Sequence, residues 1–144
     1  MWKYLLAGFV VLVGFIQIIP YEFEETLDTP IEEEIVTPIE VKEILVRSCY
    51  DCHSSSPEMP WYSDIAPFSW SIKSHIEDGR DIVNFSIFSS YDKAKQKELY
   101  EKIDESVTIR MPLPSYLWFH DEARMSEEDR KLIKDWAKSE LDED

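Results

Sequence analysis

The sequence predicts an all-α protein, in which one small helical domain is preceded by a single apolar N-terminal helix. No segment alternates apolar and polar residues in the way that a half-buried strand requires. Only three glycines occur among 144 residues, which disfavours a tight all-β fold with many turns. We therefore divide the chain into an N-terminal anchor (1–20), an acidic tether (21–36) and a helical domain (37–144) that is too short for two cores.

The N-terminal segment has the features of an export signal that is kept as a membrane anchor. Lys3 precedes an apolar run from Leu5 to Ile19, and neither a small-residue cleavage site nor a lipobox cysteine follows it. The run is close to the lower limit of about 17 residues for a transmembrane helix. The alternative is a buried helix at the start of a soluble domain.

The charges that flank this run predict its orientation. Lys3 lies on the short N-terminal side, and an acid-rich segment begins at Glu22. The positive-inside rule then places the N-terminus in the cytoplasm. We expect a single-pass protein of the cytoplasmic membrane, with the helical domain on the periplasmic or extracytoplasmic side.

The segment 21–36 is expected to be an extended tether. It has too few apolar residues to bury a face, and its negative charges repel one another. Its acidic residues are Glu22, Glu24, Glu25, Asp28, Glu32, Glu33 and Glu34.

The first helix of the domain begins with a capping signal. Thr37 is expected as the N-cap, with Pro38 at the first helical position and Glu40 in the capping box. Apolar residues then recur at helical spacing as far as the two cysteines. The members of this stripe are Val41, Ile44, Leu45, Ser48, Cys49 and Cys52.

Three more helices are expected from periodicity and caps. The second covers 67–78 and ends before Gly79, and the third covers 91–105, with Ser89 and Ser90 as caps. The last begins at Ser126, whose S-x-x-D pattern with Asp129 resembles a capping box.

Cys49, Cys52 and His53 form a C-x-x-C-H pattern, which is the attachment signature for covalently bound haem c. On a helix the two sulfurs lie on one face, where they can reach the two vinyl groups of a porphyrin, and His53 can bind the iron. These are the only cysteines in the chain, so the pattern fits one haem. It predicts a small cytochrome c-like helical domain around that haem.

Other chemistry is compatible with the same five residues. A structural disulfide would close a small, strained loop and leave His53 unexplained. A thioredoxin-like dithiol would follow a strand, whereas the preceding residues predict a helix. A zinc site would need a fourth ligand, from His75 or His120.

Met111 is the candidate for the sixth iron ligand. Its thioether lies on a loop stiffened by Pro112 and Pro114, and His/Met ligation is the arrangement that raises the reduction potential of cytochromes c. His75 is the main alternative, because it lies on the apolar face of the second expected helix. Weaker candidates are Met59, Met125 and His120, the last of which is expected on a surface loop.

The chain resembles the small bacterial haem-binding-domain proteins, a c-type cytochrome-like family that pairs an N-terminal hydrophobic segment with one CxxCH site. The resemblance covers about residues 40 to 138. It implies haem binding and electron transfer. The matching motifs are Cys49-Tyr50-Asp51-Cys52-His53-Ser54, Pro60-Trp61-Tyr62, Pro67-Phe68-Ser69-Trp70, His75 with Asp78-Gly79-Arg80, Asn84-Phe85-Ser86, and Met111-Pro112 followed by Tyr116.

The chain departs from that family pattern at two positions. Leu113 stands where a second proline usually follows Met-Pro, and Asp121 stands where a proline usually follows His120. The first departure affects the loop that carries Met111.

The charge of the chain restricts the kinds of molecule that it is expected to bind. With 30 acidic and 15 basic residues the net charge is −15, which disfavours binding to nucleic acid or to anionic lipid and favours a redox partner with a basic surface. The aromatic residues Trp61, Tyr62, Trp70 and Trp118 fit either contacts with the haem faces or an ordinary protein core.

Two functions follow from these patterns, and the sequence favours the first. It is the carriage of single electrons by a six-coordinate haem. The second is a haem enzyme or gas sensor, with an open or displaceable iron position and a polar distal group such as His75 or Arg80. An accessory role in assembling a respiratory complex is a third hypothesis.

Overall fold

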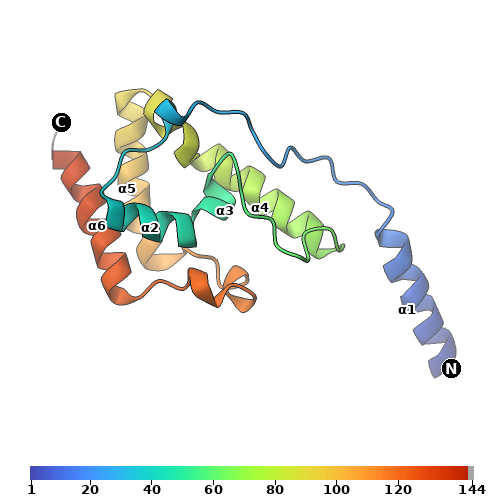
Figure 1. Cartoon of the computed structure of the whole chain (residues 1–144). Helices are drawn as coiled ribbons and strands as arrows, with labels where there is room; N and C mark the ends of the chain where they lie inside the picture. Colours follow the sequence, from blue (N-terminus) through green and yellow to red (C-terminus); the bar gives the residue numbers. More distant parts are fainter. Residues whose placement is uncertain (143–144) are drawn as a thin grey trace.

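The computed structural model describes residues 1–142, in which helices are the only regular secondary structure, as the sequence predicted. Six α-helices and four short 3₁₀ helices succeed one another along the chain (Figure 1). The α-helices are α1 (Trp2–Ile16), α2 (Ile39–Ser48), α3 (Tyr50–His53), α4 (Phe68–Ile82), α5 (Lys93–Ile109) and α6 (Glu127–Asp142). The 3₁₀ helices are η1 (Ile31–Glu33), η2 (Phe85–Ser90), η3 (Tyr116–Trp118) and η4 (Asp121–Ala123).

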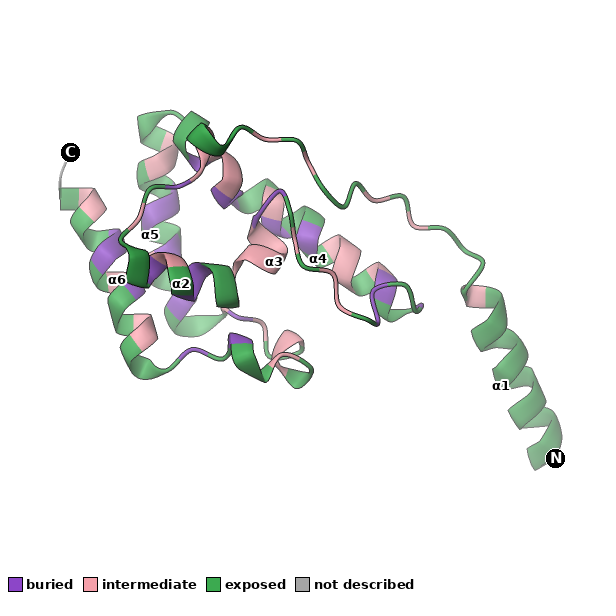
Figure 2. Cartoon of the chain, in the orientation of Figure 1, coloured by how far each residue is buried: buried purple, intermediate pink, exposed green. Residues whose placement is uncertain are grey.

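Helix α1 is shorter than the expected anchor. It has 15 residues and ends at Ile16, where the backbone passes into single turns before Pro20. In the part of the chain that the structure describes, no helix combines the length and the apolar character needed to cross a bilayer, so the transmembrane helix expected here is not supported. The alternative of a buried helix is also wrong, because α1 buries none of its residues (Figure 2).

The core lies where α2 meets the antiparallel pair α5 and α6 (Figures 1 and 2). Each helix contributes one apolar stripe, for example Leu99 and Ile103 from α5 and Ile133 from α6, all at least nine-tenths buried. Phe85 and Phe88 of η2 close one end of the core.

The caps explain where the helices begin. Ser126 and Asp129 form the expected capping box, with mutual N–H···O bonds of 2.9 and 3.1 Å. The cap of α2 differs from the expectation, because Pro38 is the N-cap and the hydroxyl of Thr37 donates to the Pro38 carbonyl instead. Helix α5 begins after Asp92, whose carboxylate accepts the N–H of Lys95 at 2.8 Å, and not after Ser89 or Ser90.

Residues 21–36 are extended except for the short η1, but they are bound along the domain, and we call them the acidic strap (Figure 1). The guanidinium of Arg80 donates to the carbonyls of Glu24 at 2.7 Å and Glu25 at 2.5 Å, and its Nε donates to Ser54 at 2.9 Å. Ile35 is 4% exposed and joins the core. The segment thus buries a residue that its composition did not predict to be buried.

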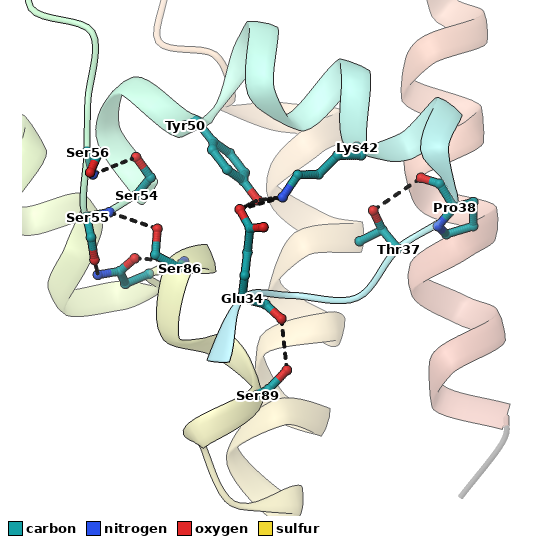
Figure 3. Close-up of polar contacts among 11 residues, drawn as sticks. Glu34, Thr37, Pro38, Lys42, Tyr50, Ser54, Ser55, Ser56, Ser86 and Ser89 are labelled. Carbon is teal, nitrogen blue, oxygen red and sulfur yellow. Dashed lines mark hydrogen bonds and ion pairs between the residues drawn. The ribbon is translucent and has the colours of Figure 1, made fainter. Parts of the chain in front are cut away.

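The end of the strap is fixed beside α2 and α3 (Figure 3). Glu34 pairs with Lys42 at 2.5 Å and accepts the hydroxyl of Tyr50 at 3.1 Å. Its carbonyl accepts the hydroxyl of Ser89 at 3.0 Å. Charge pairing, backbone contacts and the burial of Ile35 therefore hold a segment that has no continuous apolar face.

Candidate functional site

One cavity of about 430 Å³ lies between α2, α3, α4, α5 and the loop after α5. The two attachment cysteines and the three main ligand candidates from the sequence line it, whereas the weaker candidates Met59, Met125 and His120 do not. The five lining residues are Cys49, Cys52, His53, Met111 and His75. Most of the remaining lining is apolar, including Leu45, Ile72, Ile76, Ile82, Val83, Phe85, Leu99, Ile103 and Val107. The fold therefore brings Cys49 and Met111, 62 positions apart in the chain, to one cavity.

The C-x-x-C-H segment forms a helical turn of its own. Helix α2 ends at Ser48, and Cys49 stands at the break with φ −131° and ψ −34°. The Cys49 carbonyl then accepts the N–H groups of Cys52 at 3.1 Å and His53 at 3.0 Å, which closes the turn. Cys49 thus lies at the junction of α2 and α3, and Cys52 lies on α3, so the two cysteines do not share one helix, yet both line the cavity.

Both cysteines carry free thiols. Burial raises the pKa of Cys49 to about 12 and that of Cys52 to about 11, so both stay protonated at neutral pH. The disulfide alternative is not observed, and a helix precedes the pair, where a thioredoxin-like dithiol would have a strand.

His53 is oriented by the C-terminal end of α4. Its Nδ1 lies 3.0 Å from the carbonyl oxygen of Gly79 and 3.0 Å from that of Val83. Because a carbonyl can only accept, Nδ1 carries the proton and Nε2 keeps its lone pair. Burial lowers the pKa of His53, which favours the neutral ring that binds metal.

Met111 is fixed by its own backbone. Its N–H donates to the Ser106 carbonyl at 3.0 Å, and its carbonyl accepts Arg130 at 3.0 Å. The side chain is half-buried at the cavity wall, whereas His75 on α4 is exposed at the same cavity. Met125 is 5% exposed inside the core and does not line the cavity, which removes it as a ligand.

Sequence reasoning missed a polar network beside the cavity. His120, expected on a surface loop, is half-buried, and its Nε2 lies 2.8 Å from the hydroxyl of Tyr62. Its ring stacks on Tyr116 with 4.1 Å between centroids and an angle of 4°. The hydroxyl of Tyr116 in turn donates to Asp51, which, like Tyr116, lines the cavity.

This network changes the titration of Tyr116. Burial raises its pKa, and the hydrogen bond to the Asp51 carboxylate raises it further. The phenol therefore remains a hydrogen-bond donor throughout the physiological pH range. The sequence alone could not reveal this network, because it depends on contacts between residues far apart in the chain. His120, for example, has no local pattern that predicts its burial.

The tryptophans do not line the cavity. Trp61 is 79% and Trp118 is 78% exposed, and Trp70 is half-buried away from the cavity lining. Tyr62 is buried, but it contacts His120 and Phe119. Neither expected role of these aromatic residues, contact with the haem faces or a core position, applies to Trp61 and Trp118.

The donor set of the cavity fits a haem better than it fits zinc. Within residues 1–142 no group of three or more His, Cys, Asp or Glu side chains is placed to hold a metal ion, as a structural zinc would need. An apolar cavity of this volume, with two thiols, a neutral imidazole and a thioether, suits a large apolar cofactor that brings its own iron. The Ser48 hydroxyl, buried and unpaired among the described residues, also borders it.

Comparison with known proteins agrees with this assignment. A family model described as a haem-binding domain matches residues 9–139, which include every residue that lines the cavity. Neither the comparison with curated proteins nor that with solved structures gives a match. The chain belongs to the haem-binding domain family, and its cofactor is haem.

Proposed function

We propose that the protein is a mono-haem c-type cytochrome that carries single electrons. Cys49 and Cys52 would hold the haem through thioethers, and His53 and Met111 would bind its iron. The observation that carries this proposal is the common cavity into which both thiols, the free Nε2 of His53 and the Met111 loop converge. The haem supplies the redox chemistry, and this chain supplies its ligands, its orientation and the exclusion of water.

Covalent attachment is supported by the cysteines themselves. Both are unpaired and border the cavity within one turn of His53. In denaturing electrophoresis with haem staining, after expression with cytochrome c maturation machinery, pigment should stay on the polypeptide. Cys49→Ala combined with Cys52→Ala should remove it, whereas Ser54→Ala should not. Zinc without iron in the purified protein would contradict the proposal.

Met111 is the better sixth ligand, because both backbone groups of its loop are hydrogen-bonded, whereas no hydrogen bond among the described residues orients the His75 ring. A weak ligand needs a constrained loop, since the protein has to hold the sulfur in place. A six-coordinate haem then favours electron carriage over gas binding.

The enzyme or sensor hypothesis has less support from the site. Arg80, one of its two distal candidates, binds four backbone carbonyls and does not line the cavity. The other candidate, His75, is exposed. Rapid carbon monoxide binding by the unmodified ferrous protein would favour this second hypothesis.

We also propose that the domain acts outside the cytoplasm, where haem is attached to c-type cytochromes, and that α1 associates with lipid there. Helix α1 is apolar and has no buried residue, so it lacks a protein partner that would cover it. The net charge of −15 suits a redox partner with a basic surface. The full chain should stay with membranes after a carbonate wash, and a chain without residues 2–16 should not.

A further inference from the structure

A second cavity, of about 390 Å³, adjoins the haem cavity at the loop after α5. Arg110, Arg124 and Arg130 line it, although the chain as a whole is strongly acidic. Both cavities are lined by Arg110, Met111 and Pro112. Arg110 therefore lies at the boundary between the haem cavity and the second cavity.

Arg110 differs from the other cations at this place because its guanidinium has no partner among the described residues. Arg124 pairs with Asp121 at 3.0 Å, and Arg130 binds the carbonyls of Met111 and Val107. Lys102, the other cation on the α5 side of the haem cavity, pairs with Glu98 at 2.5 Å.

The charges on the two sides of the haem cavity are opposite. Asp51, Glu58 and Asp78 border it from α3, the following loop and α4. Lys102 and Arg110 border it from α5 and the residue after α5. A carboxylate bound in the cavity is therefore repelled on the first side and attracted on the second.

We propose that Arg110 binds a propionate carboxylate of the haem and so orients its propionate edge toward the end of α5. Haem carries two propionates, which need a cation or water when the ring is buried, and a guanidinium binds a carboxylate through two parallel N–H···O bonds. This inference rests on the proposed position of the haem beside Cys49, Cys52 and His53.

The pairing also makes Arg110 a positioning residue for Met111. Arg130 already holds the Met111 carbonyl from α6, and a propionate on Arg110 fixes the preceding residue from the cofactor side. The loop that carries the sulfur is then held at two successive residues.

Arg110→Gln in the haem-loaded full chain tests this. Without the cation, the negative propionate stabilises the ferric state, so the reduction potential should fall. The pKa of the propionate should rise as well, because the cation that favours its charged form is gone. When the pH is lowered, the reduction potential of the variant should therefore begin to rise at a higher pH, and rise more steeply, than that of the unmodified protein. The other titratable groups that line the two cavities are Cys49, Asp51, Cys52, His53, Glu58, His75, Asp78, Lys102, Tyr116, Arg124 and Arg130.

Arg124→Gln is the matched control, because it removes the same charge from the second cavity but not from the haem cavity. It should leave the potential and its pH dependence close to those of the unmodified protein, and Arg110→Lys should restore most of both. Arg110→Gln could fail to incorporate haem. In that case, normal haem incorporation by Arg110→Lys supports the contact between residue 110 and the propionate, and failure of both variants to incorporate haem overturns it.

Equal potentials and equal pH profiles in Arg110→Gln and Arg124→Gln would overturn this inference and leave the proposed function intact. Absence of covalent haem from the unmodified chain would instead contradict the proposed function. The two failures are thus distinguishable by haem staining before any potential is measured.

Discussion

The carbonyl oxygen of Cys52 lies 2.4 Å from the position that a Cβ atom would occupy on Gly79. Helix α4 therefore touches the C-x-x-C-H turn through its backbone. The same contact brings the Gly79 carbonyl to the ring of His53. The sequence predicted that this helix ends before Gly79, but α4 continues to Ile82.

Gly79→Ala should disrupt this contact. Alanine is normally the better helix residue by about 1 kcal/mol, but here its methyl group meets a backbone oxygen that cannot rotate away. We expect a loss of about 1–3 kcal/mol in the free energy of unfolding, with a lower haem content. Thermal unfolding and the absorbance ratio of haem to protein measure both effects.

Gly14→Ala is the control for that variant, because no atom beyond the adjoining residues and backbone of its own helix lies within 4 Å of a Cβ at Gly14. It should leave the unfolding temperature and the haem content unchanged. Equal behaviour of the two variants would mean that α4 does not pack on the attachment turn as described.

Met111→Ala should open the sixth iron position. The ferric protein should lose the weak near-infrared absorption of a sulfur-ligated haem, and the ferrous protein should bind carbon monoxide readily. His75→Ala should change neither property, because that side chain is exposed. Loss of six-coordinate spectra in His75→Ala alone would reverse the assignment.

Arg80→Ala should release the acidic strap. It removes hydrogen bonds from one guanidinium to the carbonyls of Ser54, Glu24 and Glu25, and we expect a destabilisation of about 1–3 kcal/mol. Limited proteolysis should cleave within 21–30, and amide exchange there should become faster. Arg124→Ala, which removes a pair between two exposed side chains, should leave both unchanged.

Asp129→Asn should remove a contribution to the free energy of unfolding that is present at neutral pH and lost in acid. The N–H of Ser126 and the nearby Arg47 hold the pKa of Asp129 below its usual range. A carboxyl whose pKa is lowered in the folded state adds stability above its unfolded pKa of about 3.9, and that stability is lost as the pH falls through the folded value.

Unfolding measured between pH 7 and pH 2 checks this prediction. The Asn variant should be less stable by about 0.3–1 kcal/mol at pH 7, as for a negative charge lost from the first turn of a helix, and the difference should vanish at the acid end. Asp135→Asn, on the exposed face of α6, is the control and should follow the unmodified protein. A constant difference across the range would contradict the role given to the charge.

The features that the sequence predicted correctly are those that depend on a few neighbouring residues. Three patterns each occupy a few neighbouring positions: C-x-x-C-H, Met111 with the prolines that follow it, and the S-x-x-D cap at Ser126. The structure places the first two at one cavity and forms the third as a helix cap. The extent of α1 was wrong, because apolar character continues past Ile16 while helical hydrogen bonding does not.

The parts that escaped prediction depend on contacts between distant segments. Gly79 was expected to terminate α4 because glycine often ends helices, but Cys52, 27 positions earlier, is what requires it. The burial of His120 depends on Tyr62 and Tyr116, and that of Ile35 depends on η2. No periodicity within any of these segments contains that information.

The protonated state of the two thiols has a consequence for biosynthesis. In the closed fold, Cys49 and Cys52 are poor nucleophiles, because burial keeps both in the thiol form, and α4 packs over their turn through Gly79. The thioether formation that we propose should therefore be fastest on a nascent chain whose α4 has not yet docked. The attached porphyrin would then be the surface on which the domain completes its folding, which makes maturation and folding a single ordered event.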